Sequence, residues 1–166
     1  MDDASHWDEP ADGDDLPQPP AKPLSKRQLN RIAAMQFIYA WEVSPEEDLA
    51  ARLYQFFNHL EHPREYFAFA EELAAGTIEH LGRIDDAIRE HAQNWTFSRI
   101  AKVDLAVLRL AIYELLYRLD IPPVVSINEA IEMAKTYSTL DSRRFVNGIL
   151  DRLKDKLDRP LRRPAI

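Results

Sequence analysis

The sequence predicts an all-α protein of about seven helices connected by short loops. After residue 25, apolar residues recur at steps of three and four, which is the spacing of one helix face. Prolines and capping residues separate these stretches, and none of the stretches alternates apolar and polar residues as a half-buried strand would. With 166 residues, 46% of them apolar, the chain can bury one sizeable core.

The most apolar helix begins near residue 103 and is predicted to lie at the centre of the fold. Its apolar residues fill two faces and leave little surface for water, as is typical of a helix surrounded by others. They are Leu105, Leu108, Ile112, Leu115 and Leu119 on one face, and Val107, Leu110, Ala111 and Leu116 on the other. Pro122 ends the helix, because proline lacks a backbone donor. Glu114 and Arg118 lie one turn apart, in the order that favours an ion pair.

Four helices are predicted before this central one. Ser25 can cap the first, which runs to about residue 42. Ser44, followed by a proline and two acids, has the pattern of a helix start and predicts a second helix to about residue 60. The third begins near Arg64 and stops or kinks at Gly82, and a short fourth helix follows it. Residues 94–98 then form a connector.

Two helices are predicted after the central one. Ser126 and Glu129 have the S-x-x-E spacing of a capping box, which places the start of the sixth helix there. Asp141 or Ser142 can cap the seventh. Gly148 lies inside that helix, where glycine costs about 1 kcal/mol relative to alanine. We therefore expect another helix to approach closely at Gly148.

The net charge of −7 is concentrated at the N-terminus. Residues 1–23 contain seven acids and one lysine, whereas residues 24–166 contain twenty bases and twenty-one acids. The folded part is thus nearly neutral, and any nucleic-acid binding must come from a local basic patch. Residues 1–24 are rich in Asp and Pro, and we expect them to form a disordered leader. This leader either only solubilises the chain or competes with RNA for nearby bases.

The residues do not support an enzyme. The absence of cysteine excludes disulfides, thiolate metal sites and a cysteine nucleophile, and it fits a reducing cytoplasm. No apolar stretch is long enough to span a membrane, and the acidic N-terminus lacks the apolar core of a signal peptide. The four glycines form no phosphate-binding loop. His59 and His62 have no third ligand near them, so we expect no metal, no cofactor and no catalytic residue.

The first predicted helix carries a basic start. Lys22, Lys26, Arg27 and Arg31 occur with no acid before Glu42, and aromatic residues follow in the same helix. Cations beside aromatic rings suit single-stranded RNA, because phosphates pair with the cations and bases stack on the rings. An ordinary solvated helix face explains the same residues equally well.

Four segments resemble the NusB family of transcription antitermination factors. They are MQFIYAWE in the first helix, VLRLAIYELL in the central helix, SINEAIEMAK after the double proline, and FVNGILD near the end. The resemblance covers residues 25–158. It leaves residues 1–24 as a leader and residues 159–166 as a C-terminal tail.

The resemblance implies a fold and a function. The expected fold is an N-terminal three-helix bundle packed on a C-terminal four-helix bundle. The expected function is non-enzymatic: with ribosomal protein NusE, the protein binds the boxA element of rRNA leader RNA and joins the RNA polymerase antitermination complex. That complex promotes rRNA transcription in the cytoplasm.

The resemblance also assigns site residues. Those expected at the RNA are Lys26, Arg27, Arg31, Tyr39, Asp141, Arg144 and Phe145. Asp104 falls where the family contacts NusE, although it is also an acid that favours the first turn of a helix. Gln28 and Leu29 stand at positions that are often basic in the family, so the basic patch is thinner here.

Two other functions are compatible with the resemblance. The chain could be a homodimeric interaction module whose RNA face is covered. It could also be an RNA-positioning domain related to the N-terminal domains of rRNA cytosine methyltransferases. Such an enzyme needs a following α/β domain and a catalytic cysteine, and a chain that ends at Ile166 contains neither.

Overall fold

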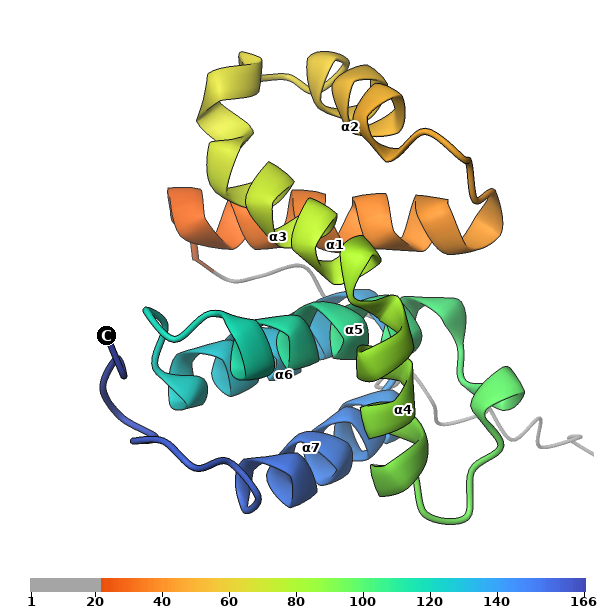
Figure 1. Cartoon of the computed structure of the whole chain (residues 1–166), viewed down its shortest axis with the longest axis vertical. Helices are drawn as coiled ribbons and strands as arrows, with labels where there is room; N and C mark the ends of the chain where they lie inside the picture. Colours follow the sequence, from red (N-terminus) through yellow and green to blue (C-terminus); the bar gives the residue numbers. More distant parts are fainter. Residues whose placement is uncertain (1–21) are drawn as a thin grey trace, which may run out of the picture.

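The computed structural model describes residues 22–166, and this part of the chain is helical with no strand, which confirms the predicted all-α class (Figure 1). Most of the predicted leader lies outside these residues. The seven α-helices are α1 (Lys26–Val43), α2 (Leu49–Asn58), α3 (Ala68–Glu79), α4 (Leu81–His91), α5 (Lys102–Tyr117), α6 (Pro123–Tyr137) and α7 (Leu140–Lys154). Two short 3-10 helices, η1 (Arg64–Phe67) and η2 (Phe97–Arg99), precede α3 and α5.

The helices form two groups that meet along α1, α3 and α5. Helices α1, α2 and α3 make the upper group in Figure 1, and α4 to α7 make the lower group. Helix α5 contacts α1 and α3 above it and α4, α6 and α7 around it, and eleven of its sixteen residues are buried. The predicted central helix and the predicted bundle arrangement are therefore confirmed.

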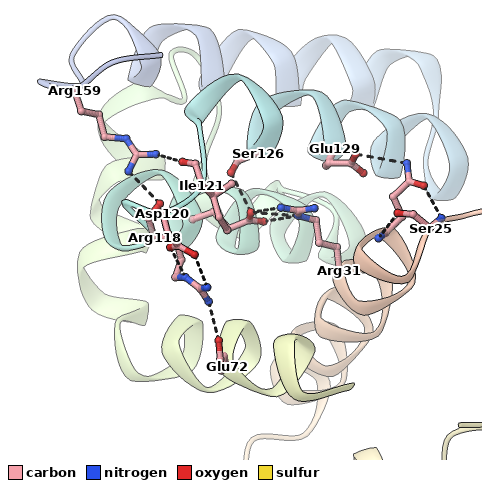
Figure 2. A network of polar contacts seen from close by, with 11 residues as sticks. Ser25, Arg31, Glu72, Arg118, Asp120, Ile121, Ser126, Glu129 and Arg159 are labelled. Carbon is pink, nitrogen blue, oxygen red and sulfur yellow. Dashed lines mark hydrogen bonds and ion pairs between the residues drawn. The ribbon is translucent and has the colours of Figure 1, made fainter. Parts of the chain in front are cut away.

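A buried ion pair joins the two groups. The Arg31 guanidinium donates to both carboxylate oxygens of Glu114 at 2.8–3.2 Å, and the two side chains are only 4% and 1% exposed. The Ser126 hydroxyl donates to the same carboxylate at 3.0 Å, so α1, α5 and α6 meet at one acid (Figure 2). This arrangement corrects two expectations. Glu114 does not pair with Arg118, and Ser126 is not a helix cap.

Arg118 instead links the end of α5 to other parts of the chain. Its guanidinium donates to both Asp120 oxygens at 2.9 Å and to Glu72 of α3 at 3.1 Å (Figure 2). The hydrogen bond and charge of Arg118 hold the pKa of the Asp120 carboxyl below its usual value. In the middle of α5, the buried Arg109 donates to Asp85 at 2.9 Å and to Glu42 at 2.7 Å, which ties α5 to α4 and α1.

The C-terminal tail lies across the turn between α5 and α6. The Arg159 guanidinium donates to the main-chain carbonyls of Arg118 and Ile121, which closes the end of α5 (Figure 2). Two backbone hydrogen bonds extend this contact. Val124 donates to the Leu161 carbonyl at 3.0 Å, and Ala165 donates to the Leu119 carbonyl at 2.8 Å.

Three helix starts differ from the sequence prediction because other residues act as caps. Helix α2 begins after Asp48, whose side chain accepts from the Ala51 N–H at 3.0 Å, while Ser44 ends α1 by donating its N–H to Ala40. Helix α7 is capped by Thr139 rather than by Asp141 or Ser142. Helix α6 begins at Pro123, before the expected capping box. Only the Ser25 cap of α1 is confirmed, with Gln28 completing a capping box.

The close approach predicted at Gly148 occurs instead at Gly76. A Cβ built on Gly148 would meet only the Arg152 side chain of its own helix, with the nearest atom at 3.6 Å. A Cβ built on Gly76 of α3 would collide with the Tyr113 ring of α5. The missing side chain at Gly76 therefore lets α3 and α5 pack across the two groups.

Replacing Arg31 with Ala should lower the free energy of unfolding by about 3–5 kcal/mol, because Glu114 then remains buried without its cation. Urea denaturation followed by circular dichroism measures the change. The control is Arg144→Ala on α7, where a side chain that is 72% exposed should shift stability by less than about 0.5 kcal/mol. Equal effects of the two substitutions would contradict the structural role of the pair.

Replacing Gly76 with Ala should lower the free energy of unfolding by about 1–3 kcal/mol, because the new methyl group overlaps the Tyr113 ring. The matched control is Gly82→Ala in the first turn of α4, where a Cβ meets nothing within 4 Å. That substitution should raise the free energy of unfolding by about 0.4–1 kcal/mol by reducing the freedom of the unfolded chain. Opposite signs in thermal melts are the expected result.

Candidate RNA interface

The start of α1 exposes two cations that lie over aromatic rings of η1 and α3. The capping box at Ser25 fixes the first turn, and Lys26 and Arg27 project from it to solvent. The Lys26 ammonium lies 4.9 Å from the centre of the Tyr66 ring, and the Arg27 guanidinium lies 3.9 Å from the centre of the Phe69 ring. Within residues 22–166 neither cation forms an ion pair.

Arg31 does not share this exposure. It lies one turn after Arg27, but its guanidinium is 4% exposed and is held by Glu114. The resemblance places Arg31 at the RNA, which stays a prediction, whereas in this structure its charge is buried against Glu114. The accessible basic start of α1 consists of Lys22, Lys26 and Arg27.

Tyr39 lies on the same helix but far from its basic start. Twelve residues separate it from Arg27, which corresponds to about 18 Å along a helix. Its side chain is 39% exposed. A strand of RNA that contacts both residues must therefore follow most of the length of α1.

The start of α7 forms a second exposed area. Asp141 and Arg144 are 91% and 72% exposed, and their charged atoms are 3.9 Å apart. Phe145 is half-buried, and its ring centre lies 5.0 Å from that of Trp95, with an angle of 51° between the rings. Together with Gly148 these residues line an open groove. Cations and rings therefore occur side by side here as well.

Trp95 was not identified from the sequence, which indicated only a connector. Its side chain is 55% exposed and stands beside Phe145 in the groove. Asn94 precedes it with a φ of 64°, a left-handed conformation that asparagine tolerates better than most residues. The sequence feature that could have identified Trp95 is an aromatic residue directly after an asparagine, which favours a turn.

The Asp104 side chain is buried beneath the start of α7 and is not an exposed contact. Its carboxylate is 4% exposed and accepts hydrogen bonds from the Ser138 hydroxyl at 2.8 Å and the Ser142 hydroxyl at 2.7 Å. These bonds tie the first turn of α5 to the α6–α7 turn. Asp104 thus fixes the position of Asp141, Arg144 and the groove.

Helix α6 lies between the two exposed areas. Gln28, in the first turn of α1, donates a long 3.5 Å hydrogen bond to Glu129 of α6 (Figure 2). The end of α6 leads directly into the start of α7. Helix α6 thus contacts the first turn of α1 and directly precedes α7.

The chemistry of these areas is that of binding. They supply cations for phosphates and rings for bases. Across residues 22–166 no three His, Cys, Asp or Glu side chains are grouped so that they could hold a metal ion. In the same part of the chain no helix is both long and apolar enough to cross a membrane.

Comparison with known proteins gives one family. The model of the NusB family matches residues 28–155. The transcription antitermination protein NusB of Geobacter sulfurreducens is 43% identical over 136 residues, which cover 81% of this chain and 97% of that protein. The protein of the same name from Thermodesulfovibrio yellowstonii is 42% identical over 137 residues, covering 77% of this chain and 91% of its own length.

Solved structures of NusB proteins have the same fold as this chain. NusB of T. maritima superposes with a TM-score of 0.70 at 37% identity, covering 81% of this chain and 94% of that one. A crystal structure described as antitermination factors NusB and NusE in complex with dsRNA has a TM-score of 0.69 at 21% identity, covering 80% and 98% of the two chains. At that identity the second likeness shows the fold alone.

Replacing Asp104 with Ala should loosen the start of α7 and lower the free energy of unfolding by about 1–3 kcal/mol, because the Ser138 and Ser142 hydroxyls lose their shared acceptor. Hydrogen exchange should accelerate in the first turn of α7 and much less in α2. Asp141→Ala is the control, since its side chain is 91% exposed and its loss should change stability by less than about 0.5 kcal/mol. Unchanged exchange in α7 after Asp104→Ala would refute the role assigned to this acid.

Proposed function

The chain belongs to the NusB family, and on that premise we propose that it is a transcription antitermination factor that binds a boxA-like segment of rRNA leader RNA together with NusE. Family membership supplies the biological setting. The observation that supports RNA binding in this chain is the pair of exposed cations, Lys26 and Arg27, which lie over the Tyr66 and Phe69 rings and form no ion pair within residues 22–166. Unpaired charge beside ring surfaces suits a flexible, single-stranded RNA.

The RNA is proposed to lie along the surface that runs from α1 past α6 to α7. Lys26 and Arg27 would hold phosphates at one end, and Arg144 would hold a phosphate at the other. The Phe145 ring, with Trp95 beside it, offers a stacking surface for a base in the groove. Asp141 next to Arg144 limits the net positive charge there, so the α1 end should supply most of the salt-dependent affinity.

We propose a supporting role for Asp104 at the NusE contact. Because the Asp104 carboxylate is already bound to Ser138 and Ser142, we expect it to support the NusE interface by fixing the α7 start rather than by direct contact. The exposed side chains that it positions, Asp141 and Arg144, are available to a partner. Because these hydrogen bonds join α5 to the start of α7, the two helices would present one preformed surface. Less conformational entropy would then be lost when NusE binds.

In the proposed function, the protein binds and releases RNA and catalyses no reaction. It would act in the cytoplasm within the RNA polymerase antitermination complex, where the nascent rRNA leader is made. A homodimer that covers α1 is the alternative, and light scattering with and without NusE distinguishes it. A dimer that persists when both NusE and RNA are present would contradict the proposal.

The affinity for single-stranded boxA RNA, measured by fluorescence polarisation with NusE present, should fall with salt at a slope of log affinity against log salt of about −2 for three phosphates. The double substitution Lys26→Ala and Arg27→Ala should weaken binding to all RNA sequences and reduce that slope by about 1.4. Arg83→Ala removes an exposed arginine from α4 and serves as the control. An unchanged slope in the double variant would exclude the α1 start as the phosphate site.

A further inference from the structure

A pocket opens between the start of α1 and the elements η1 and α3, and no RNA role has been assigned to most of its walls. Its lining includes Lys26, Arg27, Asn30, Glu65, Tyr66 and Phe69. The family resemblance pointed to the two cations but to neither Tyr66 nor Phe69. In the structure both rings are half-buried, which leaves part of each at the pocket.

The pocket is held in shape by a buried amide. The Asn30 side chain is 1% exposed and donates to the main-chain carbonyls of Lys26 at 2.9 Å and Tyr66 at 3.1 Å. Its carbonyl oxygen accepts from the Ala70 N–H at 3.0 Å. The bond to Lys26 lies within α1, and the other two connect α1 to Tyr66 of η1 and Ala70 of α3. The walls of the pocket are therefore fixed before any ligand arrives.

Rings and cations alternate around the pocket. His62 stacks on Tyr66 with ring centres 4.2 Å apart and an angle of 23° between the planes. The Lys26 ammonium lies above the Tyr66 ring, and the Arg27 guanidinium lies above the Phe69 ring. This arrangement places aromatic rings and positive charges in direct contact, and the same two kinds of group bind a base together with its phosphates.

The charges decide how a nucleotide would be oriented. Glu65 lines the pocket and would repel a phosphate placed inside it, whereas its carboxylate can accept a hydrogen bond from the edge of a base. Lys26 and Arg27 lie at the α1 side, where a phosphate can reach both. A base would therefore enter the pocket and leave its phosphates with the cations.

We propose that this pocket, formed by α1, η1 and α3, binds one unpaired nucleobase of the bound RNA, with Tyr66 as its stacking ring. The proposal rests on the proposed function, because it needs an RNA on the basic start of α1. It adds a base-binding position on the N-terminal group of helices, beyond the residues carried over from the family. The RNA would then contact α3 as well as α1, α6 and α7.

The first test compares two tyrosine–histidine ring pairs of the same chain. Tyr66→Ala should weaken binding of a short fluorescein-labelled single-stranded boxA RNA, with NusE present, by about 5- to 150-fold, which is the range for one lost base–ring stack. Tyr117→Ala is the matched control. The centre of the Tyr117 ring lies 4.0 Å from that of His80, but within residues 22–166 no cation lies over the Tyr117 ring. The control variant should bind as the unmodified protein does.

A second variant separates a lost stack from a loosened fold. Tyr66→Phe keeps the ring and should bind within about twofold of the unmodified protein, while thermal melts report the folding of each variant. Failure of Tyr66→Phe to bind, with its fold intact, would overturn the stacking role.

The second test couples the ring to a particular base. Removing one base at a time from the RNA should identify a position whose loss weakens binding to the unmodified protein but not to Tyr66→Ala. If every abasic RNA loses as much affinity with Tyr66→Ala as with the unmodified protein, the pocket holds no base.

Should Tyr66→Ala bind normally while Lys26→Ala with Arg27→Ala binds poorly, the pocket proposal fails and the proposed function stands. No binding by the unmodified protein with NusE would overturn both.

Discussion

The junction between the two groups of helices depends on one buried carboxylate. Glu114 of α5 receives the Arg31 guanidinium from α1 and the Ser126 hydroxyl from α6. Burying two charges is costly, and their attraction repays that cost only when the remaining hydrogen bonds are satisfied, as they are here. Such a pair is directional in a way that apolar packing is not. It can therefore fix the rotation of α1 against α5, while Gly76 sets how closely α3 and α5 approach.

The exposed binding surface follows from that rotation. Once Arg31 points inward, Arg27, one turn earlier, lies over Phe69 at the edge of the junction, and Lys26 lies over Tyr66. The same pattern occurs at the other end of the surface, where the buried Asp104 holds the turn that presents Asp141 and Arg144. In both places a buried charged group positions exposed ones. Arg31 and Asp104, which the resemblance places at ligands, are both buried beneath these exposed residues.

The family accounts for the function as a whole, and the structure refines where an RNA can be held. Relatives that are about 40% identical over most of the chain carry the name of an antitermination factor. The surface in this chain has fewer free cations than its basic start indicated, because Arg31 is neutralised by Glu114. Aromatic rings lie beside the cations that remain exposed. The proposed RNA would stack on two ring pairs, Trp95 with Phe145 and Tyr66 with His62, and of these four residues the sequence analysis expected only Phe145 at the RNA.

The sequence by itself determined the helical class, the central position of α5, the basic start of α1 and the family, because each of these depends on spacing or composition within a short stretch. It did not determine which polar residues pair. Glu114 has Arg118 four residues away but bonds to Arg31, which lies 83 residues away in the chain. Ser126 has the spacing of a cap but serves the same buried acid. Only the packed structure decided these pairings, because the gain from satisfying a buried charge outweighs a local helix contact of a few tenths of a kcal/mol.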